Sequence, residues 1–220
     1  INISTREDPV EFRMRRINQV QVNNKAGMTF AAALRSILRA DPDVVLIGEI
    51  RDQETANIAI EASLTGHLVL STLHTNDAPS AVTRLTEMGV EPFLLSSSLA
   101  AVMAQRLARR LCKKCKRQDT ATEAELRTLG VPHMPDTPLP TIWRPVGCRE
   151  CANTGYSGRV AIQQVMGVDS TMEDLIARGA TSIDIDKAAK EQGMTTLRKD
   201  GWQKALQGIT SVEEVLRVTV

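Results

Sequence analysis

Long apolar runs, aromatic residues and charge of one sign are all scarce in this sequence. Only 3% of its 220 residues are aromatic, and 27 basic residues nearly balance 26 acidic ones, leaving a net charge of +1. No apolar run approaches the roughly 18 residues of a membrane span, and no basic start precedes a short apolar segment as in a signal peptide. Balanced charge and few aromatic rings argue against nucleic-acid binding. We therefore expect a cytoplasmic chain with no nucleic-acid partner.

Cysteine is also rare, but its four copies are regularly spaced. Cys112, Cys115, Cys148 and Cys151 form two C-x2-C pairs separated by 32 residues. Each pair can turn two thiolates toward one point, so together they supply four tetrahedral ligands for Zn²⁺. Two redox-active pairs or four inert buried thiols are the alternatives. The spacing favours a structural zinc site with no open coordination position for catalysis.

The first half of the chain alternates short apolar runs with helical patterns, which is typical of an α/β fold with a mostly parallel sheet. Strands are predicted at 17–22, 44–47 and 67–73, and helices at 29–38, 52–63 and 79–88. Thr29 and Asp52 are suitable N-caps for the first two helices, and Gly66 is suited to end the second.

The second half is less regular. Residues 111–158 hold the cysteine pairs and a stretch, 131–145, with five prolines, so we expect loops held by a metal. A strand is predicted at 160–166, followed by helices at 172–177, 185–192, 197–207 and 212–218. We therefore predict three regions: an α/β core at 1–110, a tetracysteine zinc-binding region at 111–158, and a C-terminal helical subdomain at 159–220.

Chemically competent side chains follow the predicted strands. Glu49 comes just after the strand at 44–47, at the edge where parallel α/β sheets bind ligands, and is a candidate general base. His67 and His74 lie at the two ends of the next strand, and His74 should emerge at the same edge as Glu49. A solvated or helix-capping Glu49 and a hydrogen-bonded structural histidine remain the alternatives for each residue taken alone.

A third acidic group, formed by Glu7, Asp8 and Glu11, follows the apolar segment that starts the chain. Acidic groups at the ends of three strands would form a compact site for Mg²⁺ and phosphate. Basic residues suited to neutralise phosphate charge, with surface solvation as the equal alternative for each, are Arg35, Arg51 and Arg84.

Together these motifs resemble the family of secretion and pilus assembly ATPases, the type II secretion motors and type IV pilus extension motors. Residues 7–12 are similar to its aspartate box, 39–52 to its Walker B segment and 66–77 to its histidine box. The cysteine pairs resemble its zinc-binding insertion, and residues 208–219 resemble its C-terminal helix. The resemblance covers nearly the whole chain.

This resemblance implies part of a RecA-like P-loop ATPase core in a homo-hexameric ring, with ATP, Mg²⁺ and Zn²⁺ as cofactors. Glu49 would be the catalytic glutamate, and His74 would sense the γ-phosphate. Further catalytic candidates are Glu7 and Glu11. Candidates that bind the nucleotide or face a neighbouring subunit are Asp8, Arg35, Arg51, His67 and Arg84. The implied partners are an inner-membrane platform protein and cytoplasmic adaptor proteins, with the motor peripheral at the inner membrane and driving pilus assembly or protein export.

One family feature is missing from the sequence. The phosphate-binding loop G-x-x-x-x-G-K-[ST] is absent, because no lysine is followed by serine or threonine. Backbone N–H groups of that loop cradle the phosphates, so we expect this chain alone to bind ATP poorly and to be an inactive fragment. Absence of the strand that carries the loop should also leave apolar strand residues such as those at 68–73 exposed.

Two other functions remain open. A non-catalytic zinc-ribbon interaction module would use the α/β part only as a scaffold, and it would have no need for Glu49 and His74 at one sheet edge. A retraction motor of the same superfamily is disfavoured, since the resemblance implies that retraction motors usually lack the cysteine insertion.

Overall fold

The computed structural model describes residues 1–134 and 136–219. Pro135, inside the proline-rich stretch, and Val220 lie outside the described residues. Within the described part of the chain, no helix is both long and apolar enough to cross a membrane.

The chain packs as two units. The first combines Ile1–Val102 with Gly167–Ala189, and the second combines Met103–Met166 with Lys190–Val220. The cysteine region therefore packs with the last helices, while the helices directly after Gly167 pack with the N-terminal half. This grouping follows tertiary contacts, whereas the three regions predicted from the sequence follow composition along the chain.

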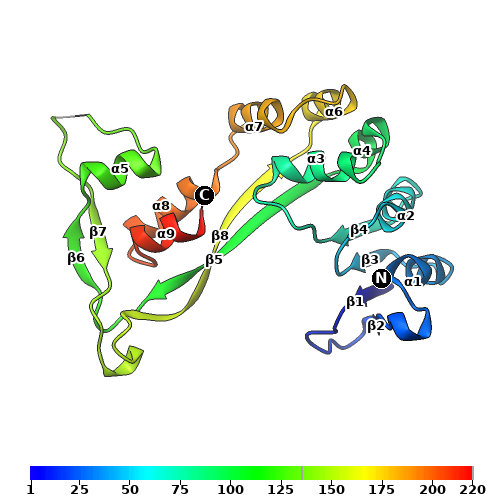
Figure 1. The fold of residues 1–220 in the computed structure, drawn as a ribbon, viewed down its shortest axis with the longest axis horizontal. Helices are drawn as coiled ribbons and strands as arrows, with labels where there is room; N and C mark the ends of the chain where they lie inside the picture. Colours follow the sequence, from blue (N-terminus) through cyan, green and yellow to red (C-terminus); the bar gives the residue numbers. More distant parts are fainter. Residues whose placement is uncertain (135, 220) are drawn as a thin grey trace. The chain divides into compact units, whose positions relative to one another are not determined.

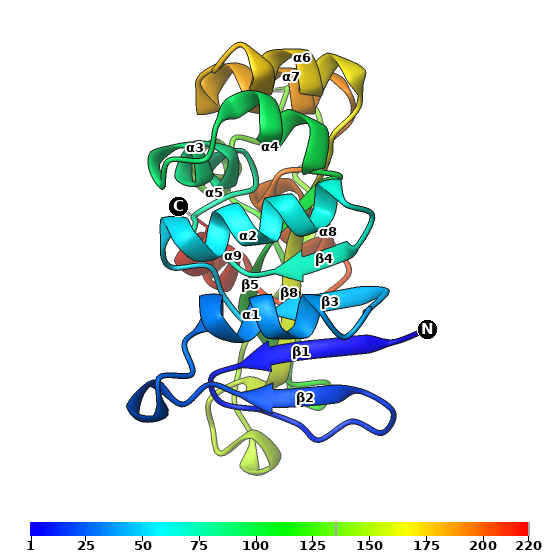
Figure 2. The same cartoon turned by 90° about the vertical axis from the view of Figure 1, so that its right-hand side faces the viewer.

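The first unit is built on a parallel sheet of four strands (Figure 2). In spatial order these are β2 (Asn18–Gln21), β1 (Ile3–Glu7), β3 (Val44–Ile47) and β4 (Leu68–Ser71). Two helices, α1 (Phe30–Leu38) and α2 (Gln53–Leu64), lie side by side over one face of it (Figure 2). Because side chains alternate along a strand, Val45 and Ile47 of β3 are fully buried while Val44 and Leu46 are only partly covered.

Both helices begin where the sequence predicted. The Thr29 hydroxyl accepts a hydrogen bond from the Ala32 N–H at 3.2 Å, and the Asp52 carboxylate accepts one from the Thr55 N–H at 2.8 Å. Gly66, at φ +103°, follows α2 in a backbone conformation that side chains disfavour. In a parallel sheet these capped helix starts lie at the carboxyl edge of the strands, which is the edge that Glu49 follows.

Strand β4 lies at the edge of the described sheet, next to β3 alone. Leu68 is 56% exposed and Leu70 is 46% exposed, and their register partners on the same face are Val44 and Leu46. The prediction that apolar residues of this strand are left uncovered is confirmed.

The first unit also contains four further helices, of which α4 packs against both α2 and α6. These helices are α3 (Pro79–Glu87), α4 (Pro92–Ser98), α6 (Ser170–Ala177) and α7 (Ser182–Glu191), whose last two residues belong to the second unit. Leu95 of α4 and Met172 of α6 are fully buried. The predicted helices at 79–88, 172–177 and 185–192 are confirmed with small shifts at their ends.

The second unit consists of two strand pairs and three helices (Figure 1). The strand pairs are β5 (Ala101–Leu111) with β8 (Tyr156–Gly167), and β6 (Arg117–Thr120) with β7 (Thr141–Arg144). Short 3-10 turns occur at η1 (Asn24–Ala26) in the first unit and η2 (Arg149–Cys151) in the second. The helices of the second unit are α5 (Glu123–Leu129), α8 (Leu197–Leu206) and α9 (Val212–Val218). Their buried apolar side chains, including Ile142, Ile162, Trp202 and Val215, form one core.

The prediction of loops across 111–158 was wrong in part, because β6, α5 and β7 lie inside this range. Helix α5 begins with a capping box, in which the Thr122 hydroxyl accepts from the Glu125 N–H and the Glu125 carboxylate accepts from the Thr122 N–H. Gly130 ends the helix at φ +70°. This Thr-x-x-Glu signal with a terminal glycine is readable in the sequence, although the prediction for this region rested on the cysteines and prolines alone.

A buried carboxylate joins β5 to α9. Glu214 is 1% exposed and accepts from the Arg109 backbone N–H at 2.8 Å, from the Arg109 guanidinium at 2.6 Å and from Arg217 at 2.7 Å. Burial raises the pKa of a carboxyl group, but the hydrogen bonds from Arg217 and Arg109 outweigh burial and lower the pKa of Glu214 to about 2.

We expect Glu214→Gln to destabilise the second unit by about 3 kcal/mol, because the variant removes the counter-charge of two arginines. The depressed pKa means that Glu214 stabilises the fold above its unfolded pKa of about 4.3, and that this contribution is lost as the pH falls toward 2. Urea unfolding of wild type and variant at pH 7 and at about pH 3 measures both effects. Their difference should shrink at the lower pH, and an unchanged difference would contradict the ion-pair role. Glu123→Gln, at an exposed position of α5, is the matched control.

Candidate functional site

The carboxyl edge of the parallel sheet gathers residues that follow three of its strands. Glu7 ends β1, Glu49 is the second residue after β3 and His74 is the third residue after β4. Neighbouring strands stay paired up to this edge, since the Gly48 N–H donates to the Arg6 carbonyl at 2.6 Å. The chain segments that carry Glu7 and Glu49 therefore run next to each other as they leave the sheet.

Gly48 permits this close approach. A Cβ atom at this position would lie 3.0 Å from the Arg6 carbonyl oxygen and 3.3 Å from the Glu7 Cα atom. On the other side, the Thr72 hydroxyl donates to the Gly48 carbonyl at 2.6 Å. Gly48 and Thr72 thus fix the backbone that presents Glu49, and neither was singled out from the sequence. A glycine between an apolar strand and an acidic residue was the available signal for Gly48.

Glu49 is held between two cationic or polar side chains. One carboxylate oxygen, Oε1, accepts from Arg51 Nη2 at 2.5 Å, and the other, Oε2, lies 3.2 Å from His74 Nε2. Glu49 is 14% exposed at its side chain, whereas His74 is 88% exposed. The hydrogen bond and charge of Arg51, followed by those of His74, lower the pKa of Glu49. The carboxylate is therefore ionised at neutral pH, as a general base requires. The sequence-based expectation that Glu49 and His74 emerge at one sheet edge is confirmed.

The acidic group after β1 lies beside this pair. Glu7 accepts hydrogen bonds from the Thr5 hydroxyl at 2.5 Å and from Gln19 Nε2 at 3.0 Å, and these bonds lower its pKa. Asp8, which precedes a cis proline, adds to the rise in the pKa of Arg51 that Glu49 mainly causes. Glu7 and Asp8 are thus at the Glu49 edge.

Glu11 contacts this acidic group through its backbone, whereas His67 lies elsewhere. Glu11 is exposed, and its backbone contact lowers the pKa of Glu7. His67 precedes β4 and so lies at the opposite end of that strand from His74, where its Nδ1 is 2.9 Å from the Ala62 carbonyl. His67 therefore closes the end of α2 and is not brought to Glu49.

The two remaining arginines form exposed ion pairs. Arg35 of α1 pairs with Glu54 in the first turn of α2 at 2.7 Å. Arg84 pairs with Glu87 on its own helix at 3.5 Å. Exposed pairs of this kind add little stability, so both guanidinium groups are free to exchange partners.

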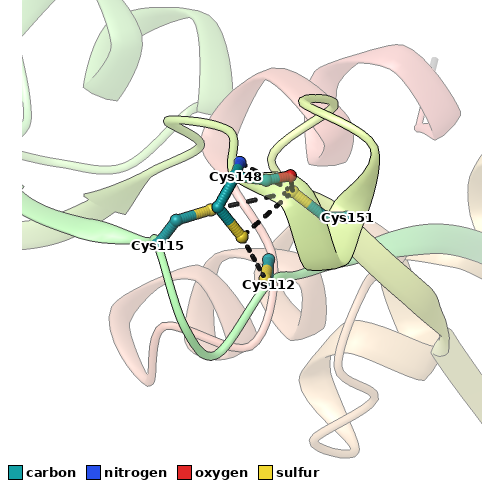
Figure 3. A group of neighbouring side chains, drawn as sticks. All are labelled: Cys112, Cys115, Cys148 and Cys151. Atoms are coloured by element: carbon teal, nitrogen blue, oxygen red, sulfur yellow. Dashed lines mark hydrogen bonds between the residues drawn. The ribbon is translucent and has the colours of Figure 1, made fainter.

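The four cysteines form a second site, in the second unit (Figure 3). Their sulfur atoms all lie within 4.8 Å of one another, and all four are free thiols. The Sγ atoms of Cys112 and Cys148 are 3.9 Å apart, those of Cys115 and Cys151 3.8 Å, and those of Cys148 and Cys151 3.7 Å. A tetrahedron with Zn–S bonds of about 2.3 Å has edges of about 3.8 Å. The donor set and its spacing therefore fit Zn²⁺.

Backbone N–H groups point at two of these sulfur atoms. The Gly147 N–H donates to Cys115 at 3.3 Å, and the N–H groups of Cys148 and Gly155 donate to Cys151 at 3.2 and 3.3 Å. Burial opposes ionisation of both cysteines. The N–H groups of Cys148 and Gly155 lower the pKa of Cys151 to about 6, whereas burial and the neighbouring thiols outweigh the Gly147 N–H and raise the pKa of Cys115 to about 11. Such N–H groups stabilise thiolates, which are the form that ligates a metal.

Known proteins resemble this chain over nearly its whole length. Residues 1–217 match the family described as Type II/IV secretion system protein. The chain is 55% identical over 218 residues to type II secretion system protein E of Pseudomonas aeruginosa, covering 99% of this chain and 43% of that protein. It is 51% identical over 219 residues to the type IV pilus assembly ATPase PilB of Thermus thermophilus, covering 100% of this chain and 24% of that protein. The chain thus spans less than half the length of these relatives.

Solved structures share the fold. The pilus retraction motor PilT with bound ADP superposes with a TM-score of 0.70 at 24% identity, over 99% of this chain and 52% of PilT. The ATPase DotB of Legionella pneumophila superposes with a TM-score of 0.65 at 21% identity, over 99% of this chain and 51% of DotB. The predicted fold class is confirmed as an α/β fold with a parallel sheet, a tetracysteine region and C-terminal helices.

Proposed function

Because this chain belongs to the type II/IV secretion system protein family, we propose that it supplies part of the active site of an ATP-hydrolysing motor. The motor powers type IV pilus assembly or type II protein secretion. The observation that carries the proposal is Glu49, an ionised carboxylate at the carboxyl edge of a parallel sheet, with one oxygen on Arg51 and the other facing His74.

In this motor Glu49 accepts the proton of the water that attacks the γ-phosphate. Both of its oxygens have partners here, so a water must take the place of one of them. His74 is the partner more easily displaced, because it is the more exposed and lies at the longer distance. Once released, His74 donates to a phosphate oxygen and Arg51 keeps Glu49 ionised.

Mg²⁺ neutralises charge on the phosphates when it is bound with ATP. Glu7 and Asp8, which lie at the same edge, carry the oxygen donors that Mg²⁺ prefers. Arg35 and Arg84 remain candidates for contacts with nucleotide or a neighbouring subunit, since their ion pairs are exposed. Glu11 and His67 act indirectly in this proposal, through the Glu7 segment and the end of α2.

Zn²⁺ is the metal proposed for the tetracysteine site, with Cys112, Cys115, Cys148 and Cys151 as its four ligands. Four protein ligands leave no position for substrate, so the ion holds the two C-x2-C turns together and takes no part in hydrolysis. The proposed division of labour has three regions: catalysis in 1–110, metal-held structure in 111–158, and helical packing in 159–220.

The working form proposed for the motor is a homo-hexamer in the cytoplasm, peripheral at the inner membrane. Its proposed partners are a membrane platform protein and cytoplasmic adaptor proteins of the pilus or secretion machine. A non-catalytic zinc-ribbon module is the second candidate, and the Glu49–His74 contact weighs against it, since a scaffold needs no ionised carboxylate beside a histidine at a ligand-binding edge.

The 220-residue chain by itself is expected to show no ATP hydrolysis above background, because it contains no phosphate-binding loop. Steady-state turnover at saturating Mg-ATP measures this, with the P. aeruginosa relative assayed in parallel. A chimaera in which this chain replaces the matching 218 residues of that relative should hydrolyse ATP. Turnover by the chain alone would refute the need for the loop, and an inactive but hexameric chimaera would refute the ATPase assignment.

A further inference from the structure

A buried arginine on β1 lacks an acidic partner. Arg6 is 5% exposed, and no ion pair to it is found among the described residues. Its Nε atom is buried without a hydrogen-bond acceptor, and its Nη1 donates only to the Met28 sulfur at 3.7 Å, a weak acceptor. Burial lowers the pKa of Arg6, and no neighbouring charge opposes that effect. An isolated cation in such a place lacks the counter-charge that buried charges normally have.

The guanidinium group lies next to the start of α1. Met28 immediately precedes Thr29, the N-cap of this nine-residue helix, and α1 packs against β1. The Thr29 hydroxyl occupies the N–H of Ala32, while the N–H groups of the first helical residues have no acceptor within the helix. The positive end of the helix and the unpaired guanidinium group therefore favour an anion at the same place.

We propose that Arg6 and the N-terminus of α1 form a subsite for a phosphate-type oxyanion, taken either from free phosphate or from a nucleotide. A guanidinium fork and helix N–H groups together match the several oxygens of a phosphate group better than those of a single carboxylate. Since α1 connects the parallel strands β2 and β3, its start lies at the same sheet edge that Glu49 follows. The subsite stands on Arg6 and α1, and it does not depend on hydrolysis by Glu49.

Arg6→Met in the 220-residue chain tests the subsite through two quantities that should change in opposite directions. The melting temperature without phosphate should increase, and the rise in melting temperature caused by phosphate should decrease. Without phosphate, the variant should melt at a higher temperature than wild type, because an uncompensated buried charge is gone. Inorganic phosphate, added against sodium chloride at equal ionic strength, should raise the wild-type Tm by about 3 °C, and this rise should be at least about fivefold smaller in Arg6→Met. Arg6→Lys, which keeps the charge but not the fork, should retain part of the rise.

Arg39→Met is the matched control, because Arg39 is exposed at the other end of α1. It should keep the full phosphate response. Repeating the series with Mg-ADP and Mg-ATP identifies the source: a rise with phosphate alone assigns free phosphate, and a rise only with nucleotides assigns their phosphate groups. A full response in Arg6→Met, or no response of wild type to any of the three, would overturn the subsite. Because the readout is stability, an inactive chimaera leaves this result untouched.

Discussion

Glu49→Gln in the chimaera should lower ATP turnover by about 10³-fold while changing ATP affinity by no more than a few-fold. The amide keeps the size and one acceptor oxygen of the side chain but cannot accept the proton of the attacking water. Steady-state turnover and nucleotide titration, measured on the same preparation, separate the two effects. Glu61→Gln, at an exposed position of α2, is the matched control and should leave both unchanged.

A second measurement tests the electrostatics around Glu49. The hydrogen bond from Arg51 lowers the pKa of Glu49, so the carboxylate remains a base below its ordinary titration range. If turnover is lost when the pH falls from 7 to 5, the cause is therefore not protonation of Glu49. Arg51→Met should raise the pKa of Glu49, since the largest cause of the lowered pKa is gone, and protonation of Glu49 should then stop turnover at a higher pH than in the parent. If the Glu49→Gln chimaera hydrolysed ATP as fast as its parent, Glu49 would not be the general base.

Local sequence signals were sufficient to predict the sheet edge at which Glu49 lies. Thr29 and Asp52 each cap a helix between parallel strands, and a carboxylate after β3 must then emerge where β4 ends. The contact between Glu49 and His74 follows from this topology, because each residue comes shortly after the end of its strand. Periodicity and caps therefore predicted most of the first unit.

The sequence was less informative where tertiary contacts decide. The resemblance made His67 a candidate for binding the nucleotide, but its Nδ1 contacts the Ala62 carbonyl at the end of α2, away from Glu49. Strand β5 pairs with β8, which begins 45 positions after β5 ends, so no local sequence pattern predicts this pairing. Arg6 is a further case: alternation places it on the helix-covered face with Ile47, but its lack of a counter-charge depends on every neighbour at once.

The tetracysteine site was predictable because a pair of C-x2-C turns has few other uses, although the spacer between them gave no hint of β6, α5 and β7. Of these elements, α5 and β7 pack into the core of the second unit together with α8 and α9. The proposed metal site therefore closes a folded segment and does not merely hold loops. Loss of this site should therefore destabilise the second unit as a whole.

Cys148→Ser should reduce bound zinc from one ion per chain to less than about a tenth, and destabilise the second unit by several kcal/mol, because three ligands hold the ion far more weakly than four. Elemental analysis of purified protein and thermal unfolding measure the two effects. Removing zinc from wild type with a chelator should reproduce the stability loss, whereas Cys148→His, which restores a fourth ligand, should recover much of both.

The same variant separates structure from chemistry. In the chimaera, Cys148→Ser should unfold at a lower temperature, yet turnover per folded molecule should stay within a few-fold of the parent, because a closed tetracysteine site offers no position to substrate. Zinc content unchanged by Cys148→Ser, or a disulfide among the four cysteines in wild type, would contradict the proposed ligand set. A loss of turnover as deep as that of Glu49→Gln, in protein that is still folded and hexameric, would show that the tetracysteine region takes part in hydrolysis itself.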